Sequence, residues 1–308
     1  MEVKLKLGME SMKKRSFKER LFNDYIGVIF SSLAGILIIV ITIAIIAFIA
    51  GKGIKTFTRG TFGPLEFLFT NNWVPEGDKP AFGALSFILG STFVSLGAVI
   101  VSAPIAVALG IFTNVITSKL GNAIIKPALE ILVGIPSVVF GWVGISVIVP
   151  FIKNHLGGGG FSLLAGIVVL SLMILPTIAT LSIDAIKGVP KEYIEASYGL
   201  GATRWQTIKG VIIPSSKSGI LTGIVLGIAR AFGEALAVQM VIGNAVKNPD
   251  GLLGTMSTIT SRITMDMANT TTGSVWNDAL WTLALILLII SFIFILIVRK
   301  IEKGSEVK

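Results

Sequence analysis

The stretch YIEASYGLGATRWQTIKGVIIP, from Tyr193 to Pro214, is polar and lies between two long apolar runs. Gly199 and Gly201 interrupt it, and glycine commonly ends a helix. Thr203 and Gln206 have the spacing of a capping box, which marks the start of a helix. The stretch therefore predicts two short helices joined at a glycine hinge, the second ending where Pro214 opens the next apolar run.

The composition of the chain assigns the rest of it to a membrane. Of its 308 residues, 53% are hydrophobic and 14% are charged, and the mean hydropathy is +0.86. A soluble domain of this length is less apolar. The net charge of +9 comes from Lys and Arg residues that mostly flank the apolar runs. Membrane lipid is therefore the expected partner of these charges, and nucleic acid is not.

The residue types present exclude several kinds of chemistry. The chain has no Cys and a single His, His155, so disulfides, thiol catalysis and a histidine metal centre are not expected. We expect no cofactor bound by this chain. No G-x-x-x-x-G-K-[S/T] motif occurs, so the chain has no phosphate-binding loop of its own for ATP. A membrane enzyme is disfavoured because no Ser/His/Asp or metal constellation is present.

Six apolar runs are long enough to cross a bilayer about 30 Å thick. The first is longer than the core of a signal peptide and is predicted to be retained. The expected fold is all-α, a polytopic membrane protein with about six transmembrane helices and one polar loop at 188–213. The runs are 26–50, 82–112, 128–150, 161–183, 214–243 and 278–298.

The distribution of basic residues predicts the orientation. Six spans place both termini on one side, and that side carries 18 of the 26 Lys and Arg residues, against 7 on the other and Arg230 within a span. The positive-inside rule then places the termini and the loop 188–213 in the cytoplasm. The predicted divisions are a basic cytoplasmic arm at 1–25, a first span with an external loop at 26–80, a membrane core at 81–300 and a cytoplasmic tail at 301–308.

Two segments on the opposite side are long enough to have structure of their own. Segment 51–80 carries aromatic residues between Phe62 and Trp73, which we expect at the headgroup level. Capping of the helix bundle and contact with a partner protein are the alternatives. Segment 244–276 is rich in Thr, Ser, Asn and Gly, and we expect an ordered external loop with short helical pieces.

Arg230 and Glu234 form the only ionisable pair deep within an apolar span. Arg230 lies 16 residues beyond Pro214, about 24 Å along a helix, so its side chain does not easily reach the cytoplasmic surface. A mid-membrane Arg costs about 2.5–3.5 kcal/mol unless it faces a partner or a water-filled path. One interpretation is a self-neutralising ion pair that locks helix packing. We favour the other, a guanidinium that grips an oxyanion beside a carboxylate able to accept its proton.

The sequence Gly134-Ile135-Pro136-Ser137 interrupts the third apolar run. Gly and Pro in a membrane helix serve as packing devices when neighbouring groups satisfy the freed backbone. They also break helices so that backbone N–H groups face an anion. From these residues alone we favour the packing role.

Glu195, Ala196, Ser197, Gly201 and Pro214 carry a resemblance to a known family. Their spacing is similar to that of the EAA loop of ABC-type import permeases, which reads Glu-Ala-Ala, three residues, Gly, nine residues, Ile-x-Leu-Pro. The resemblance implies that the loop 188–213 is a coupling helix seated in a cleft of a separate ATPase subunit. An ordinary linker between spans is the alternative. The implied coupling residues are Glu195, Ala196, Ser197, Gly201, Thr203, Arg204 and Pro214.

A second resemblance narrows the family to permease subunits of the PstC type from phosphate-specific import systems. It is carried by Gly227 to Val238, GIARAFGEALAV, by Met240 to Asn244, MVIGN, and by Ile135 to Gly141, IPSVVFG. The resemblance implies a path for phosphate that includes Arg230, Glu234, Pro136 and Ser137. It also implies three kinds of partner subunit and ATP-Mg bound by one of them. These are a homologous PstA-type permease, two copies of a PstB-type ATPase that holds the ATP-Mg, and an extracytoplasmic phosphate-binding protein.

Two alternatives remain open from the sequence. A permease of the same superfamily for sulfate, molybdate or an amino acid has the same EAA loop, so only the Arg230–Glu234 segment distinguishes it. A self-sufficient secondary carrier needs no ATPase and leaves the EAA pattern unexplained. No clear inverted repeat favours that second alternative.

Overall fold

The computed structural model describes residues 26–60, 62–76, 80–117, 119 and 121–306, so the predicted basic arm 1–25 lies outside the described residues. The chain divides into two units, Met1–Gly51 and Lys52–Lys308. In the first unit, the described residues form most of α3 (Gly27–Gly53). The residues of this helix are mainly apolar and are exposed along almost its whole length. Its length and composition fit a transmembrane helix.

Within the described residues, six helices are long and apolar enough to cross a membrane, as the sequence predicts. Besides α3 they include α6 (Leu85–Ile111) with its π-helical end η2 (Phe112–Ile116), α11 (Leu163–Lys187) and α17 (Val275–Glu306). The third is a continuous helix built from α9 (Ser137–Val143), η4 (Gly144–Ile148) and α10 (Val149–His155). The fifth consists of α13 (Arg204–Thr207), η5 (Ile208–Ile212) and α14 (Ile213–Gly233).

Two of the predicted spans are interrupted. The run 128–150 is divided between α8 (Lys126–Gly134), which follows the π-helix η3 (Gly121–Ile125), and α9. The run 214–243 is divided between α14 and α15 (Leu236–Ile242). The predicted helix end before Pro214 is wrong, because the helix runs through that residue. A π-helical turn directly precedes Pro214, and its altered hydrogen-bonding register accommodates a residue that lacks an N–H.

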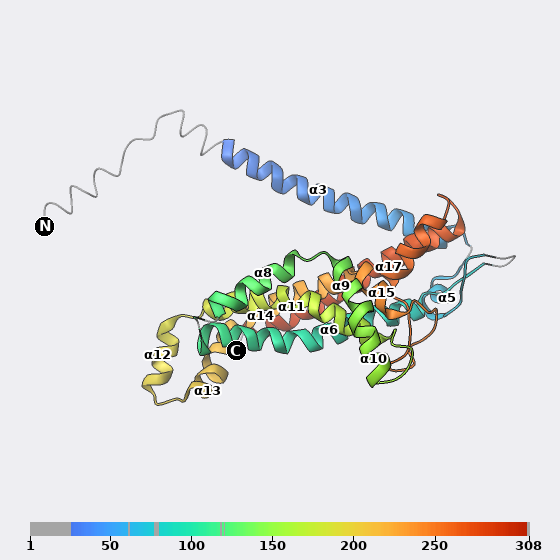
Figure 1. Ribbon diagram of the computed structural model, residues 1–308. Helices are drawn as coiled ribbons and strands as arrows, with labels where there is room; N and C mark the ends of the chain where they lie inside the picture. Colours follow the sequence, from blue (N-terminus) through green and yellow to red (C-terminus); the bar gives the residue numbers. More distant parts are fainter. Residues whose placement is uncertain (1–25, 61, 77–79, 118, 120, 307–308) are drawn as a thin grey trace. The chain divides into compact units, whose positions relative to one another are not determined.

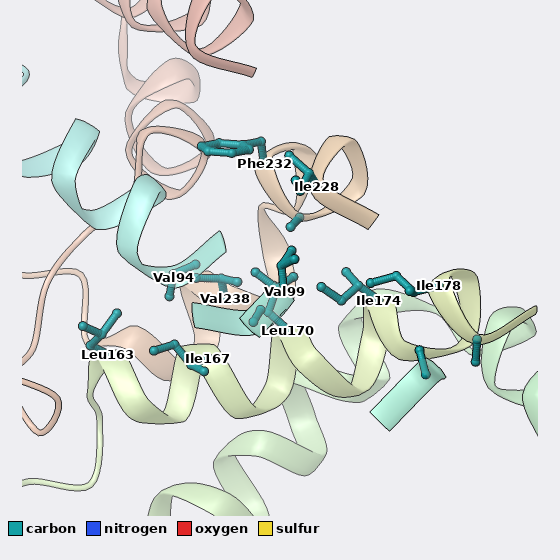
Figure 2. Close-up of a cluster of buried hydrophobic side chains, with 14 of the residues drawn as sticks. Val94, Val99, Leu163, Ile167, Leu170, Ile174, Ile178, Ile228, Phe232 and Val238 are labelled. Carbon is teal, nitrogen blue, oxygen red and sulfur yellow. The ribbon is translucent and has the colours of Figure 1, made fainter. Parts of the chain in front are cut away.

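Helix α11 is the centre of the second unit. It packs against α6, α14, α15 and α8, and it is the most deeply buried of the spans. Figure 2 shows the core that results, with apolar side chains of α6, α11, α14 and α15 meeting around Leu170 and Val99. The buried side chains labelled there are Val94, Val99, Leu163, Ile167, Leu170, Ile174, Ile178, Ile228, Phe232 and Val238.

Three glycines let α14 approach α11 closely. Gly219, Gly223 and Gly227 recur every four residues and therefore lie along one face of α14. A Cβ atom at Gly219 would lie 2.5 Å from the Cβ of Ala185, and one at Gly223 would lie 3.1 Å from the Cβ of Leu181. Small residues at this spacing are a recurrent means of helix association in membranes, where lipid removes the usual hydrophobic driving force.

One end of the bundle lies opposite α12 and α13 (Figure 1). Polar and aromatic contacts close that end. The segment between α3 and α6 contributes α4 (Lys55–Thr58), α5 (Pro64–Phe69) and a hairpin of β1 (Trp73–Val74) and β2 (Ala81–Phe82). Phe67 and Trp73 are buried in an aromatic cluster. The prediction that these aromatics anchor at the headgroups is therefore wrong for Phe67 and Trp73, which cap the bundle instead.

Asp266 holds this cap together. Its Oδ2 accepts hydrogen bonds from the indole nitrogens of Trp73 (3.0 Å) and Trp276 (3.3 Å), and its Oδ1 pairs with Arg262 at 3.2 Å. Asp266 ends α16 (Ile259–Asp266), which η6 (Met267–Asn269) follows. The short helical pieces expected in 244–276 are thus present, and one buried carboxylate joins them to the segment before α6.

The glycine contact makes a prediction about stability. We expect Gly219→Ala to destabilise the protein by about 1–3 kcal/mol, because the new methyl group meets the Cβ of Ala185, which has no rotamer to change. Gly210→Ala is the matched control, since nothing lies within 4 Å of the position its Cβ would take. That variant is expected to be neutral or stabilising by up to about 1 kcal/mol. Thermal unfolding of both variants in detergent measures the difference, and equal midpoints would contradict the close packing.

Candidate functional site

The loop 188–213 has the hinge and the capping box that the sequence predicts. Helix α12 (Lys191–Gly199) ends at the glycines, and Gly201 has a φ of +80°, a backbone conformation that residues with a Cβ rarely adopt. Thr203 then caps α13: its backbone N–H donates to Gln206 Oε1 at 2.8 Å, and its Oγ1 accepts from the Gln206 N–H at 3.4 Å. The two helices project from one end of the bundle (Figure 1).

Side-chain contacts join the two helices of this loop to each other and to the bundle. Ser197 stands where the EAA pattern has Ala, and its hydroxyl lies 3.0 Å from the hydroxyl of Thr207, which is fully buried. This contact joins α12 to α13. A guanidinium nitrogen of Arg204 donates to the carbonyl oxygen of Val115 at the end of η2. Ile208 and Ile212 pack beneath the loop in a small apolar core. The loop is therefore attached to α6 as well as to α14.

The outer surface of the loop is exposed and partly apolar. Leu200 is 90% exposed and Trp205 is 66% exposed, and the side chain of Glu195 is exposed as well. Large apolar side chains exposed together on a polar segment mark an interaction surface. Of the predicted coupling residues, Ser197 is half-buried, whereas Glu195, Ala196, Gly201, Thr203, Arg204 and Pro214 are exposed.

Arg230 lies in the last turn of α14 and contacts α11. Its Nη1 donates to Thr177 Oγ1 at 2.9 Å. Within the described residues it has no carboxylate partner within 4 Å, so the predicted possibility of a self-neutralising pair with Glu234 is not what the structure shows. The physical reason is that α14 ends at Gly233, so the two residues do not share a continuous helix. The guanidinium is half-buried, and most of its five donors are not used by the described residues.

Glu234 stabilises the helix break. Its backbone is extended (φ −75°, ψ 124°), and its Oε1 accepts the N–H of Ala237 in the first turn of α15 at 3.1 Å. Its carbonyl oxygen accepts the hydroxyl of Thr260 at 2.8 Å. Glu234 thus satisfies an N–H at the start of one helix while its own carbonyl is satisfied by α16. The structure separates Arg230 and Glu234 into two roles.

Pro136 and Ser137 also lie at a helix break. Ile135 (ψ 126°) and Pro136 (ψ 143°) are extended, and Ser137 is the first residue of α9. The expectation that this proline only serves packing within one helix is therefore wrong, because Pro136 cannot donate the N–H that would continue α8. Among the described residues, no hydrogen bond joins Ser137 to Arg230.

The segments that follow the two breaks pack against each other. A Cβ atom at Gly141 of α9 would lie 2.5 Å from Met240 Sδ, and one at Gly144 would lie 2.5 Å from a methyl group of Val241. Met240 and Val241 both belong to α15. Two interrupted helices therefore meet through glycines, beyond Arg230 as seen from the loop 188–213.

Sequence reasoning missed two parts of this site. Thr177, the partner of Arg230, gives no signal in the sequence because a lone Thr in an apolar run is common. The glycine spacing of α14 is visible in the sequence and could have predicted which face of α14 meets a neighbour. In the part of the chain that the structure describes, no group of three or more His, Cys, Asp or Glu residues is placed to hold a metal ion.

Comparisons with known proteins agree on the class of this chain. The model of the family "Binding-protein-dependent transport system inner membrane component" matches residues 106–306. A probable ABC transporter permease protein, YqgH of Bacillus subtilis, is 44% identical over 95% of this chain and 95% of the relative. The phosphate transport system permease protein PstC of Mesorhizobium japonicum is 32% identical over 83% of this chain and 85% of the relative. PstC of Pasteurella multocida is 32% identical over 79% of this chain and 82% of the relative.

A solved structure has the same fold. A chain of the inward-facing MetNI methionine ABC transporter matches with a TM-score of 0.55 and 19% identity, covering 72% of this chain and 94% of that chain. At this identity the likeness concerns the fold alone. The all-α, six-span prediction is confirmed.

The position of Glu234 predicts a difference between two substitutions. Glu234→Ala removes the oxygen that accepts the Ala237 N–H and should destabilise α15 by about 1 kcal/mol. Glu234→Gln keeps that oxygen, so α15 should stay protected. Hydrogen exchange of the α15 amides measures both variants. If Gln and Ala increase exchange equally, the charge of Glu234 matters for the helix rather than its hydrogen bond.

Proposed function

Because this chain belongs to the family of binding-protein-dependent transport system inner membrane components, we propose that it is the permease subunit of an ATP-driven importer of inorganic phosphate. Relatives named as PstC phosphate transport permeases cover most of its length at about 30% identity, which supports this substrate. The observation that carries the proposal is Arg230, a cation within a span whose described partner is a neutral hydroxyl.

Arg230 has the chemistry that an oxyanion requires. A guanidinium presents donors in a planar fork that binds two oxygens of phosphate at once. Thr177 takes one donor and fixes the orientation of the fork. An unpaired Arg within a span faces a bundle interior or a water-filled path rather than lipid. Phosphate passing Arg230 would supply the missing negative charge.

The energy for transport comes from partner subunits in this proposal. Membership of the family implies an ATPase and a substrate-binding protein as partners. We assign to this chain a PstA-type second permease, two PstB-type ATPase subunits that bind ATP-Mg, and an extracytoplasmic phosphate-binding protein. The chain itself is a multi-pass transport subunit of the membrane and not the catalyst of hydrolysis. The bias of basic residues supports cytoplasmic termini and a cytoplasmic loop 188–213 in the cell's inner or plasma membrane.

The continuity of one helix supports a mechanism of coupling. The segment Arg204–Gly233 is a single helix that begins in the loop 188–213 and carries Arg230 near its end. Closure of the ATPase pair on ATP would displace the loop, and the helix would transmit the displacement to Arg230. The predicted coupling residues Glu195, Gly201 and Arg204 would then act at one end of this helix and the substrate at the other.

The phosphate assignment is tested at Arg230. We expect Arg230→Gln to lower ATP-dependent phosphate uptake by proteoliposomes holding the complete complex about tenfold or more, because a charged hydrogen bond contributes about 1.5–3 kcal/mol. Arg230→Lys keeps the charge but not the fork and should retain part of the uptake. Arg299→Gln, an exposed position outside the core, controls for net charge. Normal uptake by Arg230→Gln would remove the arginine from the path, and uptake of another anion by the wild type would reassign the substrate.

A substitution at Leu200 tests whether the exposed surface of the loop 188–213 binds the ATPase. Its side chain is 90% exposed, so Leu200→Asp should leave the fold unchanged. Burial of a Leu in a partner contributes about 1.5–3 kcal/mol, so the substitution should weaken binding of the ATPase at least about tenfold. Leu200→Met keeps an apolar side chain and should bind normally. Co-purification of the ATPase and its stimulation by the loaded binding protein measure the effect. Unchanged stimulation of Leu200→Asp would show that this face of the loop does not meet the ATPase.

A further inference from the structure

A polar cavity lies between α8 and α11, on the side of Arg230 that leads to the loop 188–213. Its volume is about 200 Å³. Leu129 and Ile183, which are buried, form its apolar part. We call it the release pocket, and its lining residues are Lys126, Leu129, Glu130, Thr180, Ile183 and Asp184.

The charged groups of the release pocket do not pair with one another. Within the described residues, Lys126, Glu130 and Asp184 form no ion pair within 4 Å, although all three line the same cavity. Glu130 and Asp184 are exposed and Lys126 is half-buried. Charged side chains that line one cavity without pairing with each other are free to bind a polar substrate there.

One face of α11 connects this pocket to Arg230. Thr177, Thr180 and Asp184 are spaced by three and four residues, so they lie along the same face of the helix. Thr177 holds Arg230, and Thr180 and Asp184 line the pocket. Asp184 lies seven positions after Thr177, which corresponds to about 10 Å along the helix. A hydrated anion leaving Arg230 therefore meets Thr180 and then the pocket.

The mixture of charges in the pocket suits an anion that carries protons. Hydrogen phosphate has both oxygens that accept hydrogen bonds and hydroxyl groups that donate them, whereas sulfate at neutral pH only accepts. Lys126 only donates, and ionised Glu130 and Asp184 only accept. The carboxylates can therefore bond a hydroxyl of hydrogen phosphate but repel sulfate. With two carboxylates and one ammonium group the pocket carries a net negative charge, so it holds an anion weakly.

We propose that the release pocket is the last phosphate site before the cytoplasm, an inference that rests on the proposed function. Lys126 receives phosphate as it leaves Arg230. Glu130 and Asp184 accept hydrogen bonds from its hydroxyl groups and exclude anions that carry no proton. Their negative charge also makes the binding of phosphate weak, so that it dissociates quickly. This assigns a role in substrate release to three residues that the family resemblance leaves without one.

The lysine is tested by phosphate uptake of the complete complex in proteoliposomes. Lys126→Gln should lower uptake about fivefold or more while ATPase stimulation by the loaded binding protein stays within about twofold of the wild type, because the coupling loop is untouched. Lys126→Arg should recover most of the uptake. Lys187→Gln, an exposed position in the last turn of α11 outside the pocket, is the matched control. Wild-type uptake by Lys126→Gln would overturn the role of the lysine.

The carboxylates are tested by loading the vesicles with sulfate, using Glu130→Gln/Asp184→Asn. Internal sulfate should not inhibit phosphate uptake by the wild type. In the variant it should inhibit at least about threefold, because the repulsion is gone and Lys126 remains. A misfolded variant loses uptake with and without sulfate, so this gain of inhibition separates the proposal from a structural effect. Equal insensitivity of both proteins to sulfate would overturn the role of the carboxylates. Failure of the wild type to accumulate phosphate would instead refute the proposed function itself.

Discussion

The close contact of α14 with α11 positions the functional residues. In a bilayer, apolar side chains gain little by leaving lipid for each other, so helices associate through close packing and hydrogen bonds. Gly219, Gly223 and Gly227 supply that packing over two turns of α14. Arg230 follows Gly227 by three residues on nearly the same face, and so its guanidinium reaches Thr177 of α11. The contact fixes an otherwise costly charge at one place in the bundle.

The helix break at Glu234 depends on satisfying backbone groups that lipid cannot satisfy. Irregular backbone at membrane depth is stable only where protein or water provides partners. The carboxylate of Glu234 accepts a hydrogen bond from the N–H of Ala237, and the carbonyl oxygen of Glu234 accepts one from the hydroxyl of Thr260. The second break, at Ile135 and Pro136, needs fewer partners because proline has no N–H. The two breaks make room for α9 and η4 to pack against α15 through Gly141 and Gly144.

The sequence predicts what depends on composition and on local spacing. Six spans follow from apolar length, and the capping box of Thr203 follows from residue types three positions apart. The break at Glu234 could not be predicted in this way. The segment RAFGEALAV has good helix formers on both sides of Gly233, and the partner that favours the break, Thr260, is 26 residues away. The burial of Trp73 likewise depends on a distant carboxylate, Asp266.

The break also limits how far a movement of the loop 188–213 can spread. The helix from Arg204 to Gly233 is continuous, so a displacement at its first turn is carried along its length to Arg230. It ends there, because the extended backbone of Glu234 is tied to α16 and α15 is packed against α9. A helix continuing through Glu234 would carry the same movement into the far end of the bundle. In the proposed mechanism, the interruption lets Arg230 move relative to α15, so that the loop would act on the substrate path while the cap held by Asp266 stays in place.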